Sequence, residues 1–317
     1  MKNPEYRRKK FLAGIRHTVA EKYRYTKDMF EGHKMLFEYT HLIKYTPVKK
    51  IEISGDRVVF TIHNSGKDIL MRCDERDVNS MPLSCINFAA YDEEREMDSV
   101  LRLIKPKDVV FDVGSNIGWY AINILLQKKG AVVYCFEPIK SSYYYSIENF
   151  KSNNLETDKI HNFGLSDENK KIKFYFDVEC AMASSMSNLR ESKATMTEVC
   201  QVKRMDDFVA KLPSFKKLDF IKCDVEGAEL LVFKGGLETI KKFKPIIFTE
   251  MLRKWSKKFG YHPDDIIKLF RNFGYECFII YGKNLKKFSW VDGNTKEKNY
   301  LFLHKEKHKK IIKKLTR

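Results

Sequence analysis

Short apolar runs alternate with amphipathic segments through the middle of the chain. The runs at 109–111, 131–136, 160–165, 218–224 and 245–250 are typical of buried strands. Apolar residues recur at three- and four-residue spacing, as in helices, at 93–104, 141–153 and 263–273. Strands that alternate with helices predict a doubly wound α/β sheet, in which ligands bind beyond the carboxyl ends of the strands.

The first 90 residues have a different pattern. Residues 5–45 have helical spacing, which predicts an amphipathic helical segment that packs over the rest of the protein. Residues 51–73 contain three short alternating segments separated by Ser-Gly-Asp and Asn-Ser-Gly-Lys turns, and they predict an antiparallel meander. We therefore expect a helical and small β extension at 1–90, a main domain at 91–304 and a basic tail at 305–317. Within the main domain, the last two apolar runs, 275–281 and 299–304, are expected to pair antiparallel.

The most informative stretch runs from Asp108 to Gly118. An apolar run ends there in Asp112, glycines follow at positions 114 and 118, and helical composition resumes at Trp119. Strand, tight turn and helix are predicted, in which glycines admit a close ligand and the helix N-terminus presents unpaired N–H groups. A strand-turn-helix unit without a ligand has the same pattern. The candidate ligand contacts are Asp112, Gly114, Ser115, Asn116 and Gly118.

The next strand ends in Glu137, about 20 positions beyond the glycine turn, where an acidic side chain can accept both ribose hydroxyls of a nucleoside. Dinucleotide sites need Gly-x-Gly-x-x-Gly, but Asn116 occupies the middle position here. Asp112 would also repel a pyrophosphate, whereas it would attract the ammonium and sulfonium groups of S-adenosylmethionine. The loop therefore favours S-adenosylmethionine over NAD or FAD.

Composition agrees with a folded globule, with 43% hydrophobic and 13% aromatic residues. No apolar run approaches the roughly 20 residues of a membrane span, and the charged N-terminus has no apolar signal segment, so we expect a cytoplasmic protein. The seven cysteines are scattered without Cys-x-x-Cys spacing. This spacing argues against a disulfide framework or a zinc site.

The net charge of +17 is concentrated at the two ends of the chain. Residues 1–27 hold nine Lys and Arg against two acids, and residues 304–317 hold seven against one, so the intervening 276 residues carry only +4. Basic tails are usually solvated, although they can contact an anionic membrane or polymer. No aromatic-plus-basic recognition motif accompanies them, and we expect no nucleic acid partner.

Three motifs occur in order: Asp112-Val-Gly-Ser-Asn-Ile-Gly-Trp-Tyr, Phe136-Glu137-Pro138, and Lys222-Cys-Asp-Val-Glu-Gly-Ala-Glu229. Together they resemble the FkbM family of S-adenosylmethionine-dependent methyltransferases, from about Glu96 to Glu250. The resemblance implies a class I methyltransferase fold with a Rossmann-like, doubly wound sheet of seven strands, the last antiparallel. It also implies an oxygen acceptor, usually a hydroxyl of a sugar or a secondary metabolite. Ser115 and Cys223 depart from the family pattern, which has Ala and then Ile or Val at these positions.

Methyl transfer requires a group that aligns the acceptor oxygen and removes its proton. Asp224 ends the fourth strand beside the glycine turn and is the first candidate for this base, with capping of the next helix as its structural alternative. Glu250, which ends the fifth strand, is the second candidate for the base or for a polar contact. Glu226 and Glu229 are candidates for binding the substrate or for holding the loop. His262 is the last, although a lone histidine is more often incidental. Asp224 and Glu250 could also bind magnesium, but two carboxylates are too few to assign a metal.

For the donor, we assign Asp112 to the amino-acid portion and Glu137 to the ribose. Glu96 is expected near the methionine end. The adenine edge is expected at Gly164, Leu165 and Ser166.

The predicted function is O-methylation of a sugar hydroxyl, on a free or nucleotide-activated sugar, in surface polysaccharide or glycoconjugate assembly. This acceptor rests on family analogy. A lipid or secondary-metabolite hydroxyl is the alternative among methyltransferases, and the basic tails would then contact a membrane surface. Two other classes remain open, a basic nucleic-acid-binding protein and a dehydrogenase. The acceptor is expected to be recognised by loops 177–198 and 251–262.

Overall fold

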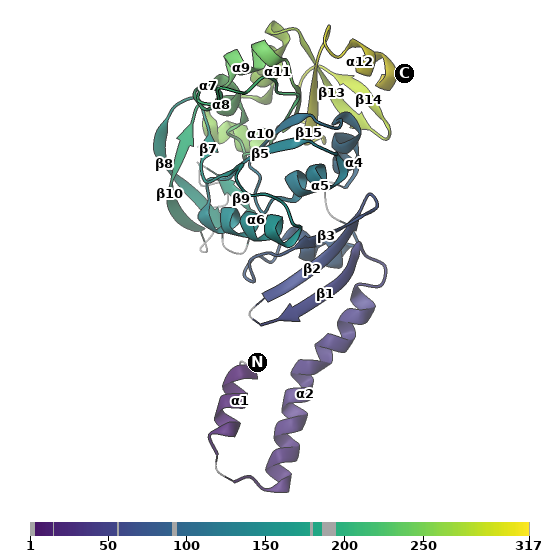
Figure 1. Ribbon diagram of the computed structural model, residues 1–317, viewed down its shortest axis with the longest axis vertical. Coiled ribbons are helices and arrows are strands. Elements are labelled where there is room, and N and C mark those ends of the chain that lie inside the picture. The colour runs from purple at the N-terminus through teal and green to yellow at the C-terminus, as the bar shows by residue number, and fades with distance from the viewer. Residues whose placement is uncertain are drawn as a thin grey trace.

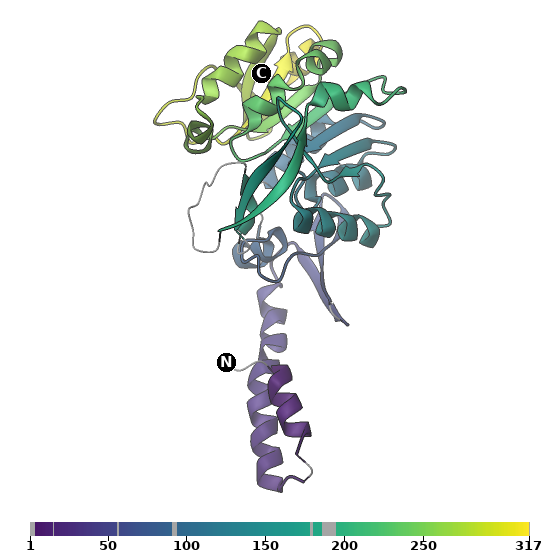
Figure 2. The same cartoon turned by 90° about the vertical axis from the view of Figure 1, so that its left-hand side faces the viewer.

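The computed structural model describes residues 4–14, 16–55, 57–90, 94–177, 180–185 and 195–316. Its body is a twisted sheet with helices on both faces, and a helical hairpin projects from one end of this body (Figures 1 and 2). A small three-stranded sheet lies between the hairpin and the body (Figure 1).

The main sheet has the strand order β14-β13-β15-β12-β11-β4-β5-β6. The central strands are parallel, whereas β15 is antiparallel to both of its neighbours, as predicted for the last two apolar runs. This arrangement confirms the class I methyltransferase fold, and β14 adds an eighth strand at one edge. The strands are β4 (Val109–Val113), β5 (Val132–Phe136), β6 (Ile160–His161), β11 (Phe220–Cys223), β12 (Ile246–Glu250), β13 (Tyr275–Tyr281), β14 (Asn284–Phe288) and β15 (Asn299–His304).

Alternate residues of each strand face opposite sides of the sheet and so enter two hydrophobic cores. Val110 and Phe248 belong to the first core, and their sequence neighbours Phe111 and Ile247 belong to the second. The first core packs against α4 (Glu94–Leu103), α5 (Trp119–Gln127) and α6 (Lys140–Ser152). The second packs against α7 (Met205–Ala210), α8 (Glu229–Lys234), α9 (Leu237–Phe243) and α11 (Pro263–Asn272).

The apolar run at 160–165 is predicted to form one strand. In the structure it forms two. β6 ends at His161 in the main sheet, while β7 (Gly164–Leu165) joins a second sheet of order β7-β10-β8-β9. Between them, Asn162 Nδ2 donates to the carbonyls of Glu137 and Pro138 (3.0 and 3.1 Å), which turns the chain away from the main sheet. The other strands of the second sheet are β8 (Lys170–Asp177), β9 (Cys180–Ser185) and β10 (Thr195–Lys203).

The loop predicted at 177–198 lies partly outside the described residues, and its described parts belong to β8, β9 and β10. The other predicted acceptor loop, 251–262, contains the short helices α10 (Arg253–Ser256) and η1 (Lys257–Phe259).

The predicted meander forms a three-stranded antiparallel sheet of β1 (Val48–Ser54), β2 (Arg57–Asn64) and β3 (Lys67–Met71). It is followed by α3 (Met81–Phe88), a helix that the sequence pattern did not predict. Ile62 and Met71 are fully buried in the first core, so the meander shares its hydrophobic core with the main domain.

Two asparagines one helical turn apart, at the end of α6, hold the edge of this meander. Asn149 Oδ1 accepts from the Arg72 N–H (2.7 Å), and its Nδ2 donates to the carbonyls of Arg72 and Ile117 (3.1 and 2.9 Å). Asn153 pairs in the same way with the N–H and carbonyl of Leu70 (3.0 and 2.7 Å). The side-chain amides thus take the place of a neighbouring strand along β3.

The N-terminal helices do not cover the sheet, which corrects the expected amphipathic cover. α1 (Pro4–Leu12) and α2 (Val19–Leu42) form the projecting hairpin, and none of their residues is buried. Only the end of α2 approaches the body, where Tyr39 and Ile43 pack against the first core. At the other terminus, α12 (Lys309–Leu315) packs its apolar side against the same core. Among the described residues, no helix is both long enough and apolar enough to span a membrane.

Asn149→Ala should destabilise the fold, because it leaves the backbone groups of Arg72 and the Ile117 carbonyl without these buried hydrogen bonds. We expect the free energy of unfolding to fall by about 2–3 kcal/mol, measured by urea unfolding with circular dichroism. Lys151→Ala, on an exposed position of the same helix, should change it by no more than about 0.5 kcal/mol. If the two substitutions lowered the free energy of unfolding equally, Asn149 would not hold the edge of the meander as described.

Candidate active site

The carboxyl ends of β4, β5, β11 and β12 bring most of the predicted polar residues to one edge of the main sheet. Asp112 lies in β4, directly beside Lys222 of β11 in the parallel register. Glu137 follows β5, Asp224 follows β11, and Glu250 ends β12. Residues more than 130 positions apart in the sequence therefore meet here because their strands are neighbours in the sheet.

A buried lysine lies at the centre of this edge. The Lys222 side chain donates from Nζ to the Gly114 carbonyl (3.1 Å) and lies 3.4 Å from Asp224 Oδ2 and 3.8 Å from Asp112 Oδ1. Lys222 is 4% exposed and Asp112 is 0% exposed. A buried charge is tolerated only when it is paired, so this lysine compensates carboxylates on two strands at once.

Lys222 belongs to one of the three sequence motifs, but the motif alone gives it no role. The available signal was a lysine inside the otherwise apolar strand β11, two positions before Asp224. A charged residue in a central strand requires a partner, and only the register with β4 identifies Asp112 as that partner.

Gly114 allows the two central strands to end in contact. Its φ is +74°, and a Cβ at this position would lie 1.9 Å from the Asp224 carbonyl oxygen. Next to this contact, the Asp224 N–H donates to the Val113 carbonyl (3.0 Å). The glycine is therefore required by the close packing of the β4 and β11 loops, in addition to any ligand.

Glu137 is tied to the glycine loop. Its Oε2 accepts from the Asn116 N–H and its Oε1 from the Ile139 N–H, both at 2.9 Å. Burial raises the pKa of Glu137 to about 7, even though these two N–H groups oppose the rise. Each carboxylate oxygen has a second lone pair, so Glu137 can still accept hydrogen bonds from a ribose.

Other parts of the predicted loop are also closely packed. Asn116 has a φ of +48°, and its buried Oδ1 has no hydrogen-bond partner among the described residues. Ser115 is 5% exposed. Gly118 has a φ of +89°, and a Cβ there would lie 3.0 Å from Phe150 and from Ser146 Oγ.

Three carboxylates gather beside Lys222. Asp224, Glu226 and Glu250 each offer an oxygen within 4.8 Å of the others, and all three side chains are partly exposed. Glu226, already a candidate from the sequence, joins the Asp224 and Glu250 pair from the turn after β11, where its φ is +52°. Such a cluster can accept several hydroxyl hydrogen bonds, and its oxygen ligands also suit a hard cation such as Mg²⁺.

Glu229 stabilises the turn that carries two members of this cluster, Asp224 and Glu226. Its Oε1 accepts from the N–H groups of Val225 (3.2 Å) and Gly227 (3.0 Å), and Tyr261 Oη lies 3.1 Å from its Oε2. Burial raises the pKa of Glu229 to about 7. Because Glu229 is only 1% exposed, its geometry suits support of the loop more than contact with a substrate.

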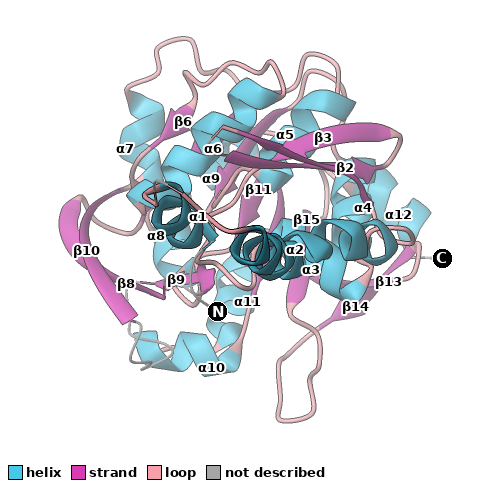
Figure 3. Cartoon of the chain, turned by 90° about the horizontal axis from the view of Figure 1, so that it is seen from below, coloured by secondary structure: helices cyan, strands magenta, loops and turns pink. Residues whose placement is uncertain are grey.

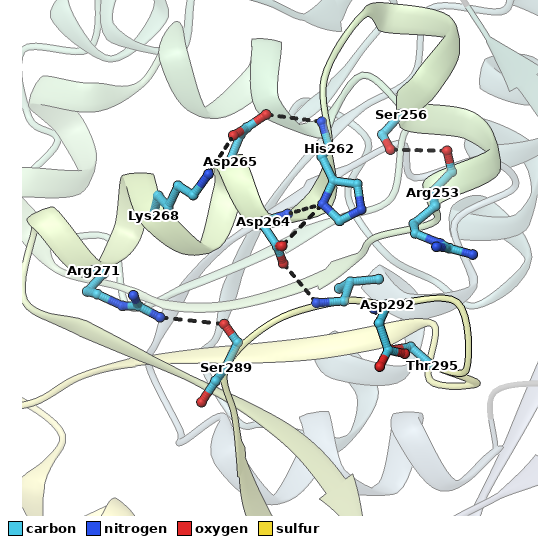
Figure 4. Close-up of polar contacts among 11 residues, drawn as sticks. Arg253, Ser256, His262, Asp264, Asp265, Lys268, Arg271, Ser289, Asp292 and Thr295 are labelled. Atoms are coloured by element: carbon cyan, nitrogen blue, oxygen red, sulfur yellow. Dashed lines mark hydrogen bonds and ion pairs between the residues drawn. The ribbon is translucent and has the colours of Figure 1, made fainter.

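His262 lies in a helix cap (Figure 4). Its Nδ1 accepts from the Asp264 N–H (3.3 Å), and Asp265 Oδ2 accepts from the His262 N–H (3.0 Å) at the start of α11. The Asp264 carboxylate also accepts from the Val291 N–H (2.8 Å), which holds the loop between β14 and β15 against the start of α11. The described contacts of His262 therefore explain its presence structurally, and its catalytic role stays a prediction.

The remaining residues predicted to contact the methyl donor have no described hydrogen bond to the carboxylate cluster. Glu96 is partly exposed in the first turn of α4. Leu165 and Ser166 are 3% and 1% exposed, and the Ser166 N–H donates to the Lys203 carbonyl (2.9 Å). Gly164 is buried in β7. Their assignment to the methionine end and the adenine edge stays a prediction.

A shallow pocket adjoins the glycine loop at Ile117. Two aromatic rings, Tyr145 and Phe176, line it, together with the first turn of α6. The N-terminal extension contributes Asp74, Arg76 and Asp77, and Arg76 forms two hydrogen bonds with the Asp74 carboxylate (2.8 and 2.7 Å). The extension therefore forms part of the wall beside the site, which the sequence did not predict.

The charge of this edge fits the predicted methyl donor. Asp112, Glu137 and the three clustered carboxylates outnumber the single buried ammonium of Lys222, so a cationic sulfonium or ammonium is attracted and a pyrophosphate is repelled. The Asn116 Oδ1 and the second lone pairs of the Glu137 carboxylate oxygens are acceptors that a ligand with N–H and hydroxyl groups can use.

Lys222→Met should strongly destabilise the protein, because it leaves the buried Asp112 carboxylate without its ammonium. We expect the free energy of unfolding to fall by about 3–5 kcal/mol, measured by urea unfolding. Adding Asp112→Asn to this variant should recover part of the loss, and Lys216→Met, at an exposed position, should have little effect. A Lys222→Met protein as stable as the Lys216→Met control would contradict the pairing.

Comparison with known families supports the methyltransferase prediction. A family model described as "Methyltransferase FkbM domain" matches residues 112–277. The chain is 28% identical over 169 residues to the 2-O-methyltransferase NoeI of Sinorhizobium fredii, with 49% of this chain and 67% of that protein covered. It is 25% identical over 142 residues to Methyltransferase 1 of Beauveria bassiana, with 40% and 57% covered.

Among solved structures, the chain is similar to the methyltransferase FkbM of Methylobacillus flagellatus, with 15% identity and a TM-score of 0.39. That match covers 73% of this chain and 55% of the other. The matched regions of these relatives thus span about one half to two thirds of their own lengths.

Proposed function

We propose that this chain, which belongs to the FkbM family of S-adenosylmethionine-dependent methyltransferases, transfers a methyl group to a sugar hydroxyl with Asp224 as the base. The observation that carries the proposal is the cluster of Asp224, Glu226 and Glu250 beside the loop expected to bind the donor. An oxygen acceptor is further supported by the printed name of one relative, a 2-O-methyltransferase.

S-adenosylmethionine supplies a methyl group on a cationic sulfur, already activated for displacement. Glu137 would accept the ribose hydroxyls, and the negative edge around Asp112 would hold the cationic end of the ligand. Asn116 would offer its Oδ1 to a donor group of the ligand. These residues would bind and orient the ligand, so substituting them would mainly lower the affinity for the ligand.

Asp224 is the best placed of the three carboxylates to act as a base. It follows β11 next to Gly114, and its side chain is 29% exposed, so an acceptor can reach it. In the proposed step the acceptor oxygen bonds to the methyl carbon, the carbon–sulfur bond breaks with its electron pair left on sulfur, and the hydroxyl proton passes to Asp224. Lys222, 3.4 Å away, fixes the position of this carboxylate.

A sugar fits the surroundings better than an apolar metabolite. Adjacent hydroxyls of a sugar can each donate to one of the clustered carboxylates, and the pocket beside Ile117 offers Tyr145 and Phe176 to an apolar ring face. A lipid hydroxyl would need an apolar channel, whereas the described lining of this pocket includes Asp74, Arg76 and Asp77. Surface polysaccharide or glycoconjugate assembly remains the proposed context.

Asp224→Asn should lower kcat by about 10²–10⁴-fold, because the amide cannot accept the proton. Its affinity for S-adenosylhomocysteine should stay unchanged, which calorimetry would check. Lys234→Gln, on the exposed side of α8, is the matched control and should keep full activity. Activity abolished by a chelator and restored by Mg²⁺ would contradict direct proton transfer to Asp224 and favour a metal at the cluster.

The acceptor class is tested by incubating the enzyme with S-adenosylmethionine and separate panels of free sugars, sugar nucleotides and lipid-linked alcohols. We expect a mass gain of one methyl on a sugar hydroxyl, located by tandem mass spectrometry. A gain only on lipid or non-sugar alcohols would overturn the sugar proposal and leave the methyltransferase assignment intact.

The affinity for S-adenosylhomocysteine should rise with pH between about 6 and 8. The pKa of Glu137 is about 7 instead of 4.5, so the folded protein holds a proton there at pH 6, and the ionised form accepts ribose hydroxyls better. Loss of that proton as the pH rises should strengthen binding by up to about tenfold. Glu137→Gln should bind weakly with little pH dependence. An equal slope in both proteins would rule out the ribose role of Glu137.

A further inference from the structure

Helix α2 presents an apolar stripe to solvent. Val19, Tyr23, Phe30 and Phe37 recur at intervals of four and seven residues, so they lie on one side of the helix, and they are 84%, 71%, 52% and 64% exposed. Thr26 and His33 fill the remaining positions of this heptad pattern. Single exposed apolar residues are ordinary, but apolar residues that recur on one side of a projecting helix mark an interaction surface.

Helix α1 packs on a different side of α2 and covers only its first half. The Phe11 ring stacks on Tyr25 with 3.9 Å between centroids, and Arg7 donates to the Asp28 carbonyl (3.3 Å). Tyr25 is only partly exposed, in contrast to its neighbour Tyr23 in the stripe. Beyond α1, Met35 and Leu36 are each 54% exposed. The two helices of the hairpin lie side by side (Figures 2 and 3). All four stripe side chains remain more than half exposed in this arrangement.

We propose that this stripe is a dimer interface, at which α2 of one copy packs antiparallel against α2 of a second copy. The stripe is defined as Val19, Tyr23, Phe30 and Phe37. With α1 on the outside of each α2, the two hairpins would form a four-helix assembly, and the two bodies would lie at its opposite ends.

The charges of α2 favour the antiparallel arrangement. Its first half, residues 19–30, carries three bases (Lys22, Arg24, Lys27) against two acids. Its second half, residues 31–42, carries two acids (Glu31, Glu38) against one base, so the two halves have net charges of +1 and −1 with His neutral. Antiparallel pairing places the basic half of each helix against the acidic half of the other. Parallel pairing would place like charges together, which is unfavourable.

The area of the stripe sets the expected strength of the pair. A large apolar side chain offers on the order of 150–250 Å² when fully accessible, so side chains more than half exposed contribute roughly 100 Å² each. The four stripe side chains therefore give about 400 Å² per copy and about 800 Å² for the pair. This area is at the low end of protein–protein interface sizes, so we expect a dimer that dissociates on dilution.

A membrane surface fits this helix less well. Helices that lie on anionic membranes carry a polar face rich in Lys and Arg, whereas α2 has as many acids as Lys and Arg residues. The acidic half, with Glu31 and Glu38, would be repelled by anionic lipid headgroups.

Sedimentation velocity of the full chain tests the interface. We expect a dimer, and Phe30→Glu with Phe37→Glu should raise its dissociation constant at least about a hundredfold. Tyr281→Glu with Trp290→Glu places the same charges on exposed aromatics of the main domain, 72% and 64% exposed, and should leave the dimer intact. Thermal unfolding and circular dichroism would verify that each variant is folded. A monomeric wild type, or a stripe variant that stays dimeric, would overturn the proposal.

Charge reversal tests the orientation. Lys22→Glu with Lys27→Glu should weaken an antiparallel dimer by about tenfold, because acidic halves then meet. Adding Glu31→Lys and Glu38→Lys should restore it. No weakening by the first pair would contradict the antiparallel arrangement. Co-sedimentation of a monomeric wild type with phosphatidylserine vesicles, lost in the stripe variant, would assign the surface to a membrane instead.

Discussion

The contact between β4 and β11 is the constraint on which the rest of the site depends. Gly114 lets the loops after the two strands touch, and Lys222 then lies between Asp112 on one strand and Asp224 on the other. Removing either feature would separate the loop expected to bind the donor from the carboxylate expected to act on the acceptor. The same buried ion cluster therefore holds the two loops together and positions the proposed base. This double role accounts for a charged residue, Lys222, inside the central strand β11.

Charge decides which ligands this edge can accept. The carboxylates outnumber the one buried ammonium, so the field favours a cationic donor and hydroxyl acceptors over phosphate-rich ligands. The basic excess of the chain lies elsewhere, in the N-terminal segment and in the C-terminal helix α12. Net charge alone would have pointed to a polyanion, whereas its distribution leaves an acidic active edge on a basic protein.

Much of the fold could be predicted from periodicity, because parallel strands buried on both faces leave continuous apolar runs such as Ile246, Ile247 and Phe248. The motif positions likewise predicted which carboxylates reach the edge. Residues whose partners are distant in sequence could not be assigned, since the register sets Lys222 beside Asp112 and a side-chain ladder from Asn149 holds the meander. Amphipathic spacing in α2 predicted a helix correctly, but it could not say that the apolar side would face solvent instead of the sheet.

Calorimetric titration of the purified full chain with S-adenosylhomocysteine and, separately, with NAD tests the methyl-donor site most directly. We predict binding of S-adenosylhomocysteine in the micromolar range, loss of that binding in Glu137→Ala, and no binding of NAD. Binding of NAD in preference to S-adenosylhomocysteine, or binding of S-adenosylhomocysteine that is indifferent to Glu137, would contradict the assignment of this edge as the methyl-donor site.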